Sequence, residues 1–328
     1  MRVGKLPPEL LQKLVLSKIS VERDDVLVHA GLGEDSAIID FGDEVCIISS
    51  DPITGAVAGI GELAVHVSCN DVAACGGNPV GIQVVLLLPE HIEEEQIGEI
   101  MTDIQHAAAG LGVEIIGGHT EITSKVNDCV VAVTAIGRAP KDRFVTSSGA
   151  RPGDDLILTK GVGIEATLIL AQDFPDLLPR SEVTEEALKW FRDRLSVVPE
   201  GVYAAQHGAH AMHDITEGGL LGALAELTIA SGLGCEVWEQ AVHIPPLTGA
   251  YVEALGIDPL KLLSSGAMLI AAAEGQGLVH GLAGLGIPAY IVGRMTDRAE
   301  RILVRKDGRR EEVPLFVQDE LWRVLADN

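Results

Sequence analysis

Aromatic side chains are scarce in this chain of 328 residues, where phenylalanine, tyrosine and tryptophan together make up 3%. Hydrophobic residues nevertheless account for 47% of the sequence, so leucine, valine, isoleucine and alanine must pack the core. A chain of this length is long enough for two domains of ordinary size.

Basic residues are also few: 24 lysines and arginines stand against 48 acids, which gives a formal net charge of -24. This balance argues against a nucleic-acid-binding surface, which needs basic patches, and against attraction to anionic lipid. An acidic protein that handles phosphate groups must screen its carboxylates, and a divalent cation is the usual means.

The sequence lacks paired cysteine motifs and long apolar runs. Its cysteines form no CxxC pair and have no close histidine partner, which predicts reduced, mostly buried thiols in a cytoplasmic protein. We expect no signal peptide and no membrane span, because no apolar run follows a basic start and none reaches about 18 residues. The cysteines are Cys46, Cys69, Cys75, Cys129 and Cys235.

The most informative stretch is 68–79, which predicts a helix that starts near Gly61 and ends at the pair Gly76 and Gly77. On this helix Asp71 shares one face with apolar residues spaced by four. A buried carboxylate needs a cation, a donor or water as partner. Asp71 is therefore either a site residue or a satisfied structural or surface acid. The apolar neighbours are Leu63, Val67 and Cys75.

Two further turns carry acids beside predicted strands. The loop 31–36, with Glu34 and Asp35, precedes the apolar run 37–41 and is either a metal or phosphate site or a solvated acidic loop. The strand 44–50 is expected to stop with Asp51 at its tip, because Pro52 cannot continue a central ladder. Strand ends are common places for functional sites.

Glycine pairs mark two more strand ends. Gly117 and Gly118 follow the predicted strand 113–116 and precede His119 and Thr120. The stretch 214–219 precedes a predicted helix over 220–230, so its polar groups are expected at a helix N-terminus, which favours anions. The alternative for Thr216 is an ordinary N-cap.

Weaker signals remain open. The segment 137–154 is either an inter-domain connection or part of a polyphosphate cradle, and Gly161-Val162-Gly163 is only a fragment of a nucleotide-binding fingerprint. A metal stripe of histidines is a minor alternative. The cradle would use Arg138, Lys141, Arg143 and Arg151, and the stripe His207, His210 and His213.

Both halves follow a strand–helix–strand order with a glycine-rich acidic turn, which predicts two α+β domains over 1–150 and 151–328. The carboxylates of Asp35, Asp51 and Asp71 suit octahedral Mg²⁺ shared with phosphate oxygens. The sequence has neither a Walker lysine loop nor a Gly-x-Ser-x-Gly elbow, so any ATP must bind by another scheme.

Five motifs in one order resemble the ATP-binding superfamily of aminoimidazole ribotide (AIR) synthetase, selenophosphate synthetase, thiamine monophosphate kinase and the hydrogenase maturation protein HypE. The resemblance covers about residues 30 to 300 and is closest to HypE-like, AIR synthase-related proteins. The motifs are Gly33-Glu34-Asp35-Ser36-Ala37, Ser50-Asp51, the stretch 70–77, Gly117-Gly118-His119-Thr120, and the stretch 214–219.

This resemblance implies two α+β domains, with the N-terminal sheet joining that of a second subunit in a β-barrel-like dimer core and a C-terminal α/β sandwich beside it. It implies ATP in the cleft, with Mg²⁺ held by Asp35, Asp51, Asp71, Asp214 and Glu217. Asp71 and His119 would act in catalysis. The remaining ATP-binding positions would be Ser50, Asn70, Gly76, Gly77, Gly117, Gly118, Thr120 and Thr216, besides Asp35.

Two departures from the family pattern bear on the reaction. HypE and the thiamine kinase usually have aspartate at the position of His119, and imidazole replaces a carboxylate poorly on a hard cation, so the number of metal ions is left open. HypE also ends in a tail cysteine that carries its carbamoyl group, whereas the last cysteine here is Cys235. We therefore expect no modification of the protein's own tail.

The sequence thus predicts a cytoplasmic, homodimeric enzyme that uses Mg-ATP to phosphorylate or activate an oxygen of a small-molecule or protein acceptor that is not identified. The first alternative is a small-molecule kinase of the thiamine monophosphate kinase type. The second is a nucleotide-binding maturation or assembly factor without turnover.

Overall fold

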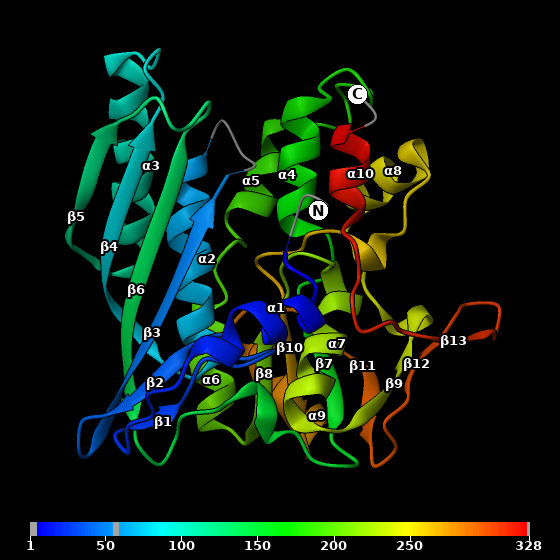
Figure 1. Ribbon diagram of the computed structural model, residues 1–328. Coiled ribbons are helices and arrows are strands. Elements are labelled where there is room, and N and C mark those ends of the chain that lie inside the picture. The colour runs from blue at the N-terminus through cyan, green and yellow to red at the C-terminus, as the bar shows by residue number, and fades with distance from the viewer. Residues whose placement is uncertain (1–4, 55–58, 327–328) are drawn as a thin grey trace.

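The computed structural model describes residues 5–54 and 59–326 and contains two mixed sheets with their helices (Figure 1). The first half contains α1 (Pro8–Leu14), β1 (Val26–Val28), β2 (Ala37–Asp40), β3 (Glu44–Ile53), α2 (Ile60–Ala74), β4 (Asn78–Leu88), α3 (Glu94–Leu111), β5 (Glu114–Ile122) and β6 (Val130–Pro140). The second half contains β7 (Asp155–Thr159), α4 (Ile164–Asp173), α5 (Glu185–Arg192), α6 (Val198–Gln206), β8 (Ala209–Asp214), α7 (Gly219–Ser231), β9 (Gly234–Trp238), α8 (Pro246–Leu255), β10 (Met268–Ala272), α9 (Gly275–Gly284), β11 (Ala289–Thr296), β12 (Arg301–Val304), β13 (Arg310–Glu312) and α10 (Glu320–Ala326).

The first sheet has the strand order β1-β2-β3-β6-β4-β5, and its pairs are antiparallel except for β4 with β5. Helices α2 and α3 pack against one face, where alternate strand residues such as Ile82, Val84 and Val133 are buried with Val65 and Ile104 of the helices. The alternation of β4 and β6 follows the period of two expected for a sheet covered on one face.

Strand β3 does not stop at Asp51 as we predicted. It continues through Pro52 to Ile53, paired along its full length with β6, so Asp51 lies inside the strand. Pairing of β3 with β2 ends at Ile48. The other side of β3 is therefore open beyond that point, and proline fits there as it does on an edge strand.

Strand β5 also differs from the prediction. It runs from Glu114 to Ile122, so Gly117, Gly118, His119 and Thr120 lie within the strand rather than after its end. The strand forms the edge of the first sheet, and its residues from Gly117 onward are exposed.

The second sheet has the order β13-β12-β9-β11-β7-β10-β8 and is covered on both faces. Leu156, Leu158 and Leu269 pack toward α4, α7 and α8, whereas Ile157 and Ile270 pack toward α6 and α9. Because both faces are covered, every residue of β10 is buried. The second half is therefore the α/β sandwich that the family resemblance implied.

Helix α2 joins the two halves, as Figure 1 shows by its place between the first sheet and the second domain. Ala73 and Ala74 belong to the core formed by α6 and the second sheet. The Asn70 side chain donates to the Leu195 carbonyl at 2.9 Å and accepts the Val197 N–H at 2.8 Å. These contacts tie the helix that bears Asp71 to the second half. The predicted boundary at residue 150 falls between β6 and β7.

The first helix of the described chain is short. α1 ends at Leu14, a 3₁₀ turn follows at Leu16–Lys18, and no residue of α1 is buried. Leu10 and Leu14 of this helix are exposed.

The described residues include no helix long and apolar enough to cross a membrane. The five cysteines are free, and Cys69, Cys75 and Cys235 are buried. Our expectations about the two ends of the chain concern residues 1–4 and 327–328, which lie outside the described residues.

Candidate active site

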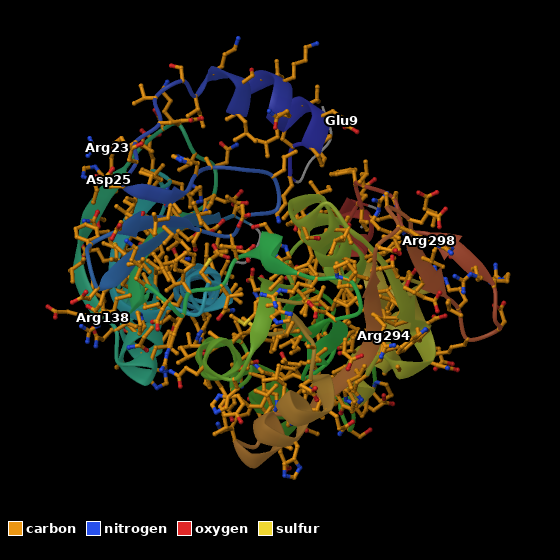
Figure 2. The ribbon with its side chains drawn as sticks, turned by 90° about the horizontal axis from the view of Figure 1, so that it is seen from below. Glu9, Arg23, Asp25, Arg138, Arg294 and Arg298 are labelled. Atoms are coloured by element: carbon orange, nitrogen blue, oxygen red, sulfur yellow. The ribbon has the colours of Figure 1, made fainter. Side chains whose placement is uncertain are left out.

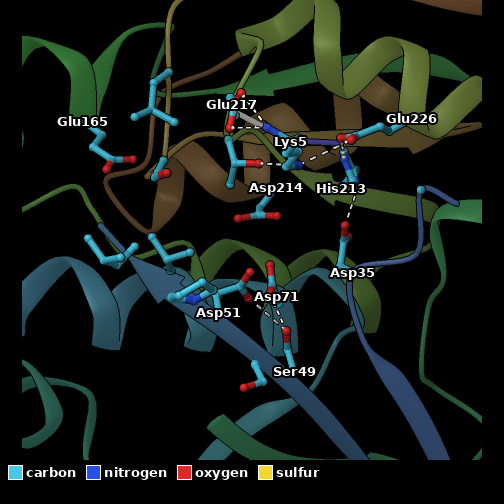
Figure 3. Close-up of a pocket in the computed structure, with 18 of the residues that line it drawn as sticks. Lys5, Asp35, Ser49, Asp51, Asp71, Glu165, His213, Asp214, Glu217 and Glu226 are labelled. Carbon is cyan, nitrogen blue, oxygen red and sulfur yellow. Dashed lines mark hydrogen bonds and ion pairs between the residues drawn. The ribbon is translucent and has the colours of Figure 1, made fainter. Parts of the chain in front are cut away.

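A cavity of about 440 Å³ lies between the two halves, and its lining includes eight acidic side chains. Its volume falls in the usual range for small-molecule sites, roughly 300–1,000 Å³. Figure 3 shows the acids facing one another across it, from β3 and α2 on one side and from the second half on the other. The carboxylates are those of Glu34, Asp35, Asp51, Asp71, Glu165, Asp214, Glu217 and Glu226.

Asp51 and Asp71 meet on the first-half wall beside Ser49. The Ser49 hydroxyl lies 2.5 Å from Asp71 Oδ2 and 3.3 Å from Asp51 Oδ2. This hydroxyl is the donor partner that a buried Asp71 required. Burial raises the pKa of Asp71 well above its usual value, and the nearby charges of Asp214 and Asp51 raise it further.

His213, at the end of β8, is held between two carboxylates. Its Nδ1 lies 2.5 Å from Asp35 Oδ1 and its Nε2 lies 2.8 Å from Glu226 Oε2. Burial acts to lower the pKa of His213, but Asp35 and Glu226 outweigh it and raise that pKa well above the usual value. A carboxylate at each ring nitrogen favours the protonated form of His213, and the ring links the loop of Asp35 to α7.

Asp214 stands next to His213 and has an unsatisfied oxygen. Its pKa is raised to about 7, first by burial and then by the charge of Asp35. The Oδ2 atom is buried and has no hydrogen-bond partner. His213 and Lys5 act in the opposite direction, but burial and the neighbouring acids outweigh them and disfavour ionisation of Asp214.

Lys5 brings a positive charge to the same wall. Its backbone N–H donates to the Glu217 carboxylate at 3.1 Å, and its ammonium lies 3.3 Å from Thr216 Oγ1 and 3.4 Å from Glu226 Oε1. Burial opposes the charge of Lys5, but Glu226 and Asp214 raise its pKa overall. Since 49% of the side chain is exposed, water screens these attractions.

The turn that precedes α7 positions Thr216 and Glu217. Gly218 and Gly219 have φ values of 87° and 61°, in the region that favours glycine. The Gly218 N–H donates to Asp319 Oδ2 at 2.7 Å, and Gly218 is the N-cap of α7. The N-cap alternative for Thr216 is therefore wrong, and its hydroxyl faces Lys5 instead.

Of the residues proposed from the sequence, the cavity brings together Asp35, Ser50, Asp51, Asp71, Asp214, Thr216 and Glu217. Asn70 and Gly76 instead lie at the junction of the halves, where a Cβ on Gly76 would press on Ala205, and Gly77 packs against Ile47 and Val72 within the first half. The segment 117–120 is on the edge strand β5 and is not part of this cavity.

The residues of the proposed phosphate cradle and of the histidine stripe do not form common sites in the structure. Arg138 pairs with Glu44 and Lys141 with Asp40, and neither lines the cavity, so these two do not form a polyphosphate cradle there. Figure 2 shows Arg138 at the periphery of the molecule. The three histidines have separate partners: His207 stacks on Tyr203, His210 pairs with Asp154, and His213 binds the two acids above.

Sequence reasoning named His213 only in the histidine stripe and did not propose several other polar residues that line the cavity, among them Lys5, Ser49, Glu165, Glu226, Ser265 and Trp322. Ser49 and His213 are each next to a proposed site residue along the chain, and Glu165 follows the glycine fragment at 161–163. These neighbours were signals that could have been used. Lys5 and Glu226 carry no comparable signal, since their places depend on how distant segments pack.

The acids of the cavity can be compared with what a divalent cation needs. Within the described chain, no three side chains already converge as a metal-binding cluster. Asp214 Oδ2 has no hydrogen-bond partner, and the pKa values of Asp71 and Asp214 stay raised although Lys5 and His213 lower that of Asp214, so these two cations only partly balance the acids. The donor set fits Mg²⁺, which prefers one or two carboxylates and completes its shell with water and phosphate oxygens.

Two family models match the chain: the N-terminal domain of AIR synthase related protein over residues 33–139 and its C-terminal domain over residues 151–306. The chain belongs to the AIR synthase related protein family. Its relatives include a putative hydrogenase expression/formation protein of Methanocaldococcus jannaschii, 26% identical over 98% of this chain and 97% of the relative. The carbamoyl dehydratase HypE of Rhodobacter capsulatus is 27% identical over 98% and 95%.

Solved structures of this family share the fold. HypE in complex with ATP superimposes with a TM-score of 0.74 and 21% identity, covering 95% of each chain. A ThiL protein complexed with AMPPCP and TMP gives a TM-score of 0.76 and 20% identity, covering 94% of this chain and 96% of that one. Together with the family models they show the two-domain AIR synthase fold.

Proposed function

We propose that this protein is a Mg-ATP-dependent enzyme that phosphorylates, and so activates, an oxygen of an acceptor. The observation that carries the proposal is the convergence of Asp51 and Asp71 from one half with Asp214 and Glu217 from the other on a single cavity. The relatives add support, because structures of HypE and ThiL contain ATP and AMPPCP.

The residues of the cavity would have different roles in this reaction. Asp51, Asp71 and Asp214 would hold Mg²⁺ on the phosphates, and the ion would neutralise the negative charge of the group being transferred. Lys5 would contribute a second positive charge at Thr216 and Glu217. His213 would fix the loop of Asp35 against α7, so that both walls of the cavity keep their spacing.

The acceptor is expected to be separate from the protein's own thiols. Cys69 and Cys75 are buried on α2 and its C-cap, and burial raises the pKa of the Cys69 thiol to about 12. The pKa of the Cys75 thiol is also well above its usual value. A thiol is a poor nucleophile until it is ionised, so these cysteines are unsuited to carry an activated group.

Calorimetric titration with Mg-ATP tests this proposal. Asp51→Asn and Asp71→Asn should each weaken binding roughly tenfold or more, a loss of about 1.4 kcal/mol or more. Asp142→Asn, an exposed acid outside the cavity, is the matched control and should bind as the wild type does. Unchanged affinity in both cavity variants would refute the proposal.

Phosphate release then separates the remaining alternatives. An enzyme that acts on an added acceptor, including a small-molecule kinase, should release ADP faster when that acceptor is present. A nucleotide-binding assembly factor should bind Mg-ATP without turnover under any of these conditions. We also propose a homodimer through the first sheet, which light scattering at micromolar concentration would detect.

A further inference from the structure

The cavity has a second end that the phosphate chemistry does not use. Figure 3 shows Glu165 apart from the acids around Lys5 and His213. Ser265 is hydrogen-bonded to Glu165, the neighbouring Ala166 N–H donates to the Leu263 carbonyl, and Ile169 follows one turn later on α4. The lining of the cavity also includes the apolar side chains of Ile53 and Val67 and the indole of Trp322.

Glu165 is a buried acid with one oxygen left over. It lies in the first turn of α4, is 4% exposed, and its Oε2 has no hydrogen-bond partner. Ser265 makes a side-chain hydrogen bond to the carboxyl group, and burial raises the pKa of Glu165 to about 7. Leaving a buried carboxylate oxygen unpaired costs free energy, so a donor is missing at this position.

No basic side chain of the described cavity lining supplies that donor. Lys5 pairs with Thr216, Glu217 and Glu226, and His213 pairs with Asp35 and Glu226. The charged group that shifts the pKa of Glu165 is another acid, Asp319. The missing partner of Glu165 is therefore expected to come from a ligand.

Trp322 limits what that ligand can be, and the turn that carries Ser265 is fixed by hydrogen bonds. Trp322 also lines the cavity, and its indole Nε1 is buried without a partner; this nitrogen can only donate, so it suits an oxygen. The turn of Ser265 is held in place because Ser264 Oγ accepts the Gly163 N–H at 2.6 Å and donates to the Leu262 carbonyl.

We propose that Glu165, Ser265 and Trp322 form the acceptor subsite of the enzyme and that it takes a cationic nitrogen group, an ammonium or amidinium, carried on an apolar body. The cation pairs with Glu165, the apolar body packs on Ile169 and Leu263, and Trp322 donates to an oxygen of the acceptor. An acidic cavity in an acidic protein attracts cations. Only the identification of this ligand as the acceptor rests on the proposed function.

Benzamidine, a planar cation on an apolar ring, is the probe, and benzamide is its neutral counterpart of nearly equal shape. Binding is measured by calorimetry at pH 8, where Glu165 is mostly ionised. We expect benzamidine to bind the wild type at least tenfold more tightly than benzamide does. Glu165→Gln should weaken benzamidine binding at least tenfold, and Ser265→Ala should weaken it less.

Two control variants separate this site from the acidic end. Glu62→Gln changes a partly buried glutamate beside a different cavity and should leave benzamidine binding unchanged. Asp51→Asn should keep benzamidine binding while losing Mg-ATP binding, and Glu165→Gln should do the reverse. The two proposals therefore fail in different measurements.

Three results would overturn the subsite. One is the absence of saturable benzamidine binding to the wild type. Another is equal affinity of the wild type and Glu165→Gln, with circular dichroism showing both folded. The third is loss of benzamidine in Asp51→Asn with retention in Glu165→Gln, which would assign the cation to the acidic end.

Discussion

The glycine pair at 117–118 and the pair at 218–219 look alike in the sequence but lie in opposite environments. The first is in the exposed edge strand β5, where His119 and Glu121 face solvent. The second is at the start of α7, where Gly218 is fixed by Asp319 and the adjoining Thr216 and Glu217 line the cavity. A glycine pair beside polar residues therefore marks unusual backbone, and only packing decides whether a site is built around it.

The same contrast holds for charge. The pair of His119 and Glu121 is exposed and spans 3.3 Å, and such surface pairs contribute little to stability. In the cavity, by contrast, burial raises the pKa of Asp214 and Glu165. A cationic ligand would therefore favour ionisation of these buried acids, whereas the exposed pair on β5 offers no comparable site.

The largest expected effect lies within β5 itself. At Gly118 the φ value is 152°, and an added Cβ would overlap the carbonyl oxygen of Val84. At Gly117 nothing lies within 4 Å of such a Cβ. We expect Gly118→Ala to lower the free energy of unfolding by about 3 kcal/mol or more and Gly117→Ala to change it little, as measured by urea denaturation. Equal losses in the two variants would contradict the structure.

The second prediction concerns the buried acid Glu165 and the dependence of protein stability on pH. A glutamate in water has a pKa of 4.5, whereas burial raises the pKa of Glu165 in the folded protein to about 7, so the folded state binds this proton more tightly than the unfolded state does. Stability therefore falls as pH rises from about 4.5 to 7, and the whole cost is present above pH 7. The shift sets an upper limit of about 3 kcal/mol.

Glu165→Gln removes that cost. The variant should melt at about the same temperature as the wild type near pH 4.5 and at a higher temperature at pH 8, by calorimetry. Glu121→Gln, on the exposed strand β5, is the matched control and should show little change at either pH. A difference between Glu165→Gln and the wild type that does not vary with pH would contradict the burial of this charge.

Much of the fold could be predicted from the sequence, because periodicity reports which faces are buried. The helix that carries Asp71 and the fully apolar strand β10 follow from local pattern. The extent of β3 could not be predicted, because Pro52 is tolerated only where β2 no longer pairs. The aspartates of the site were found through motifs, whereas Lys5 and Glu226 were not, because their contact joins residues 221 positions apart.

A third experiment tests whether β5 and the cavity are separate in the assembled protein. If a second copy brings its β5 to the cavity, as the predicted roles of His119 and of the homodimer require, His119→Ala should weaken Mg-ATP binding about tenfold. Its melting temperature should not change, because 63% of the side chain is exposed. Unchanged affinity in a protein that light scattering shows to be dimeric would remove His119 from the site.

The smallest expected effect concerns Lys5, the cation that partly balances the cavity. Lys5 lies within 3.4 Å of Glu226 and donates to the Glu217 carboxylate through its backbone. Lys5→Met keeps the backbone contact and removes the charge, so without metal it should destabilise the protein by about 1 kcal/mol or less, given its exposure.

Mg²⁺ makes this last prediction specific. If the cavity binds the ion, adding Mg²⁺ should raise the melting temperature of Lys5→Met more than that of the wild type, because the variant has one more unbalanced carboxylate. Lys13→Met, an exposed lysine of α1, should respond to Mg²⁺ as the wild type does. If Lys5→Met and Lys13→Met respond alike, Lys5 does not share the cavity's charge with the metal, and its contacts serve only to hold the N-terminal segment in place.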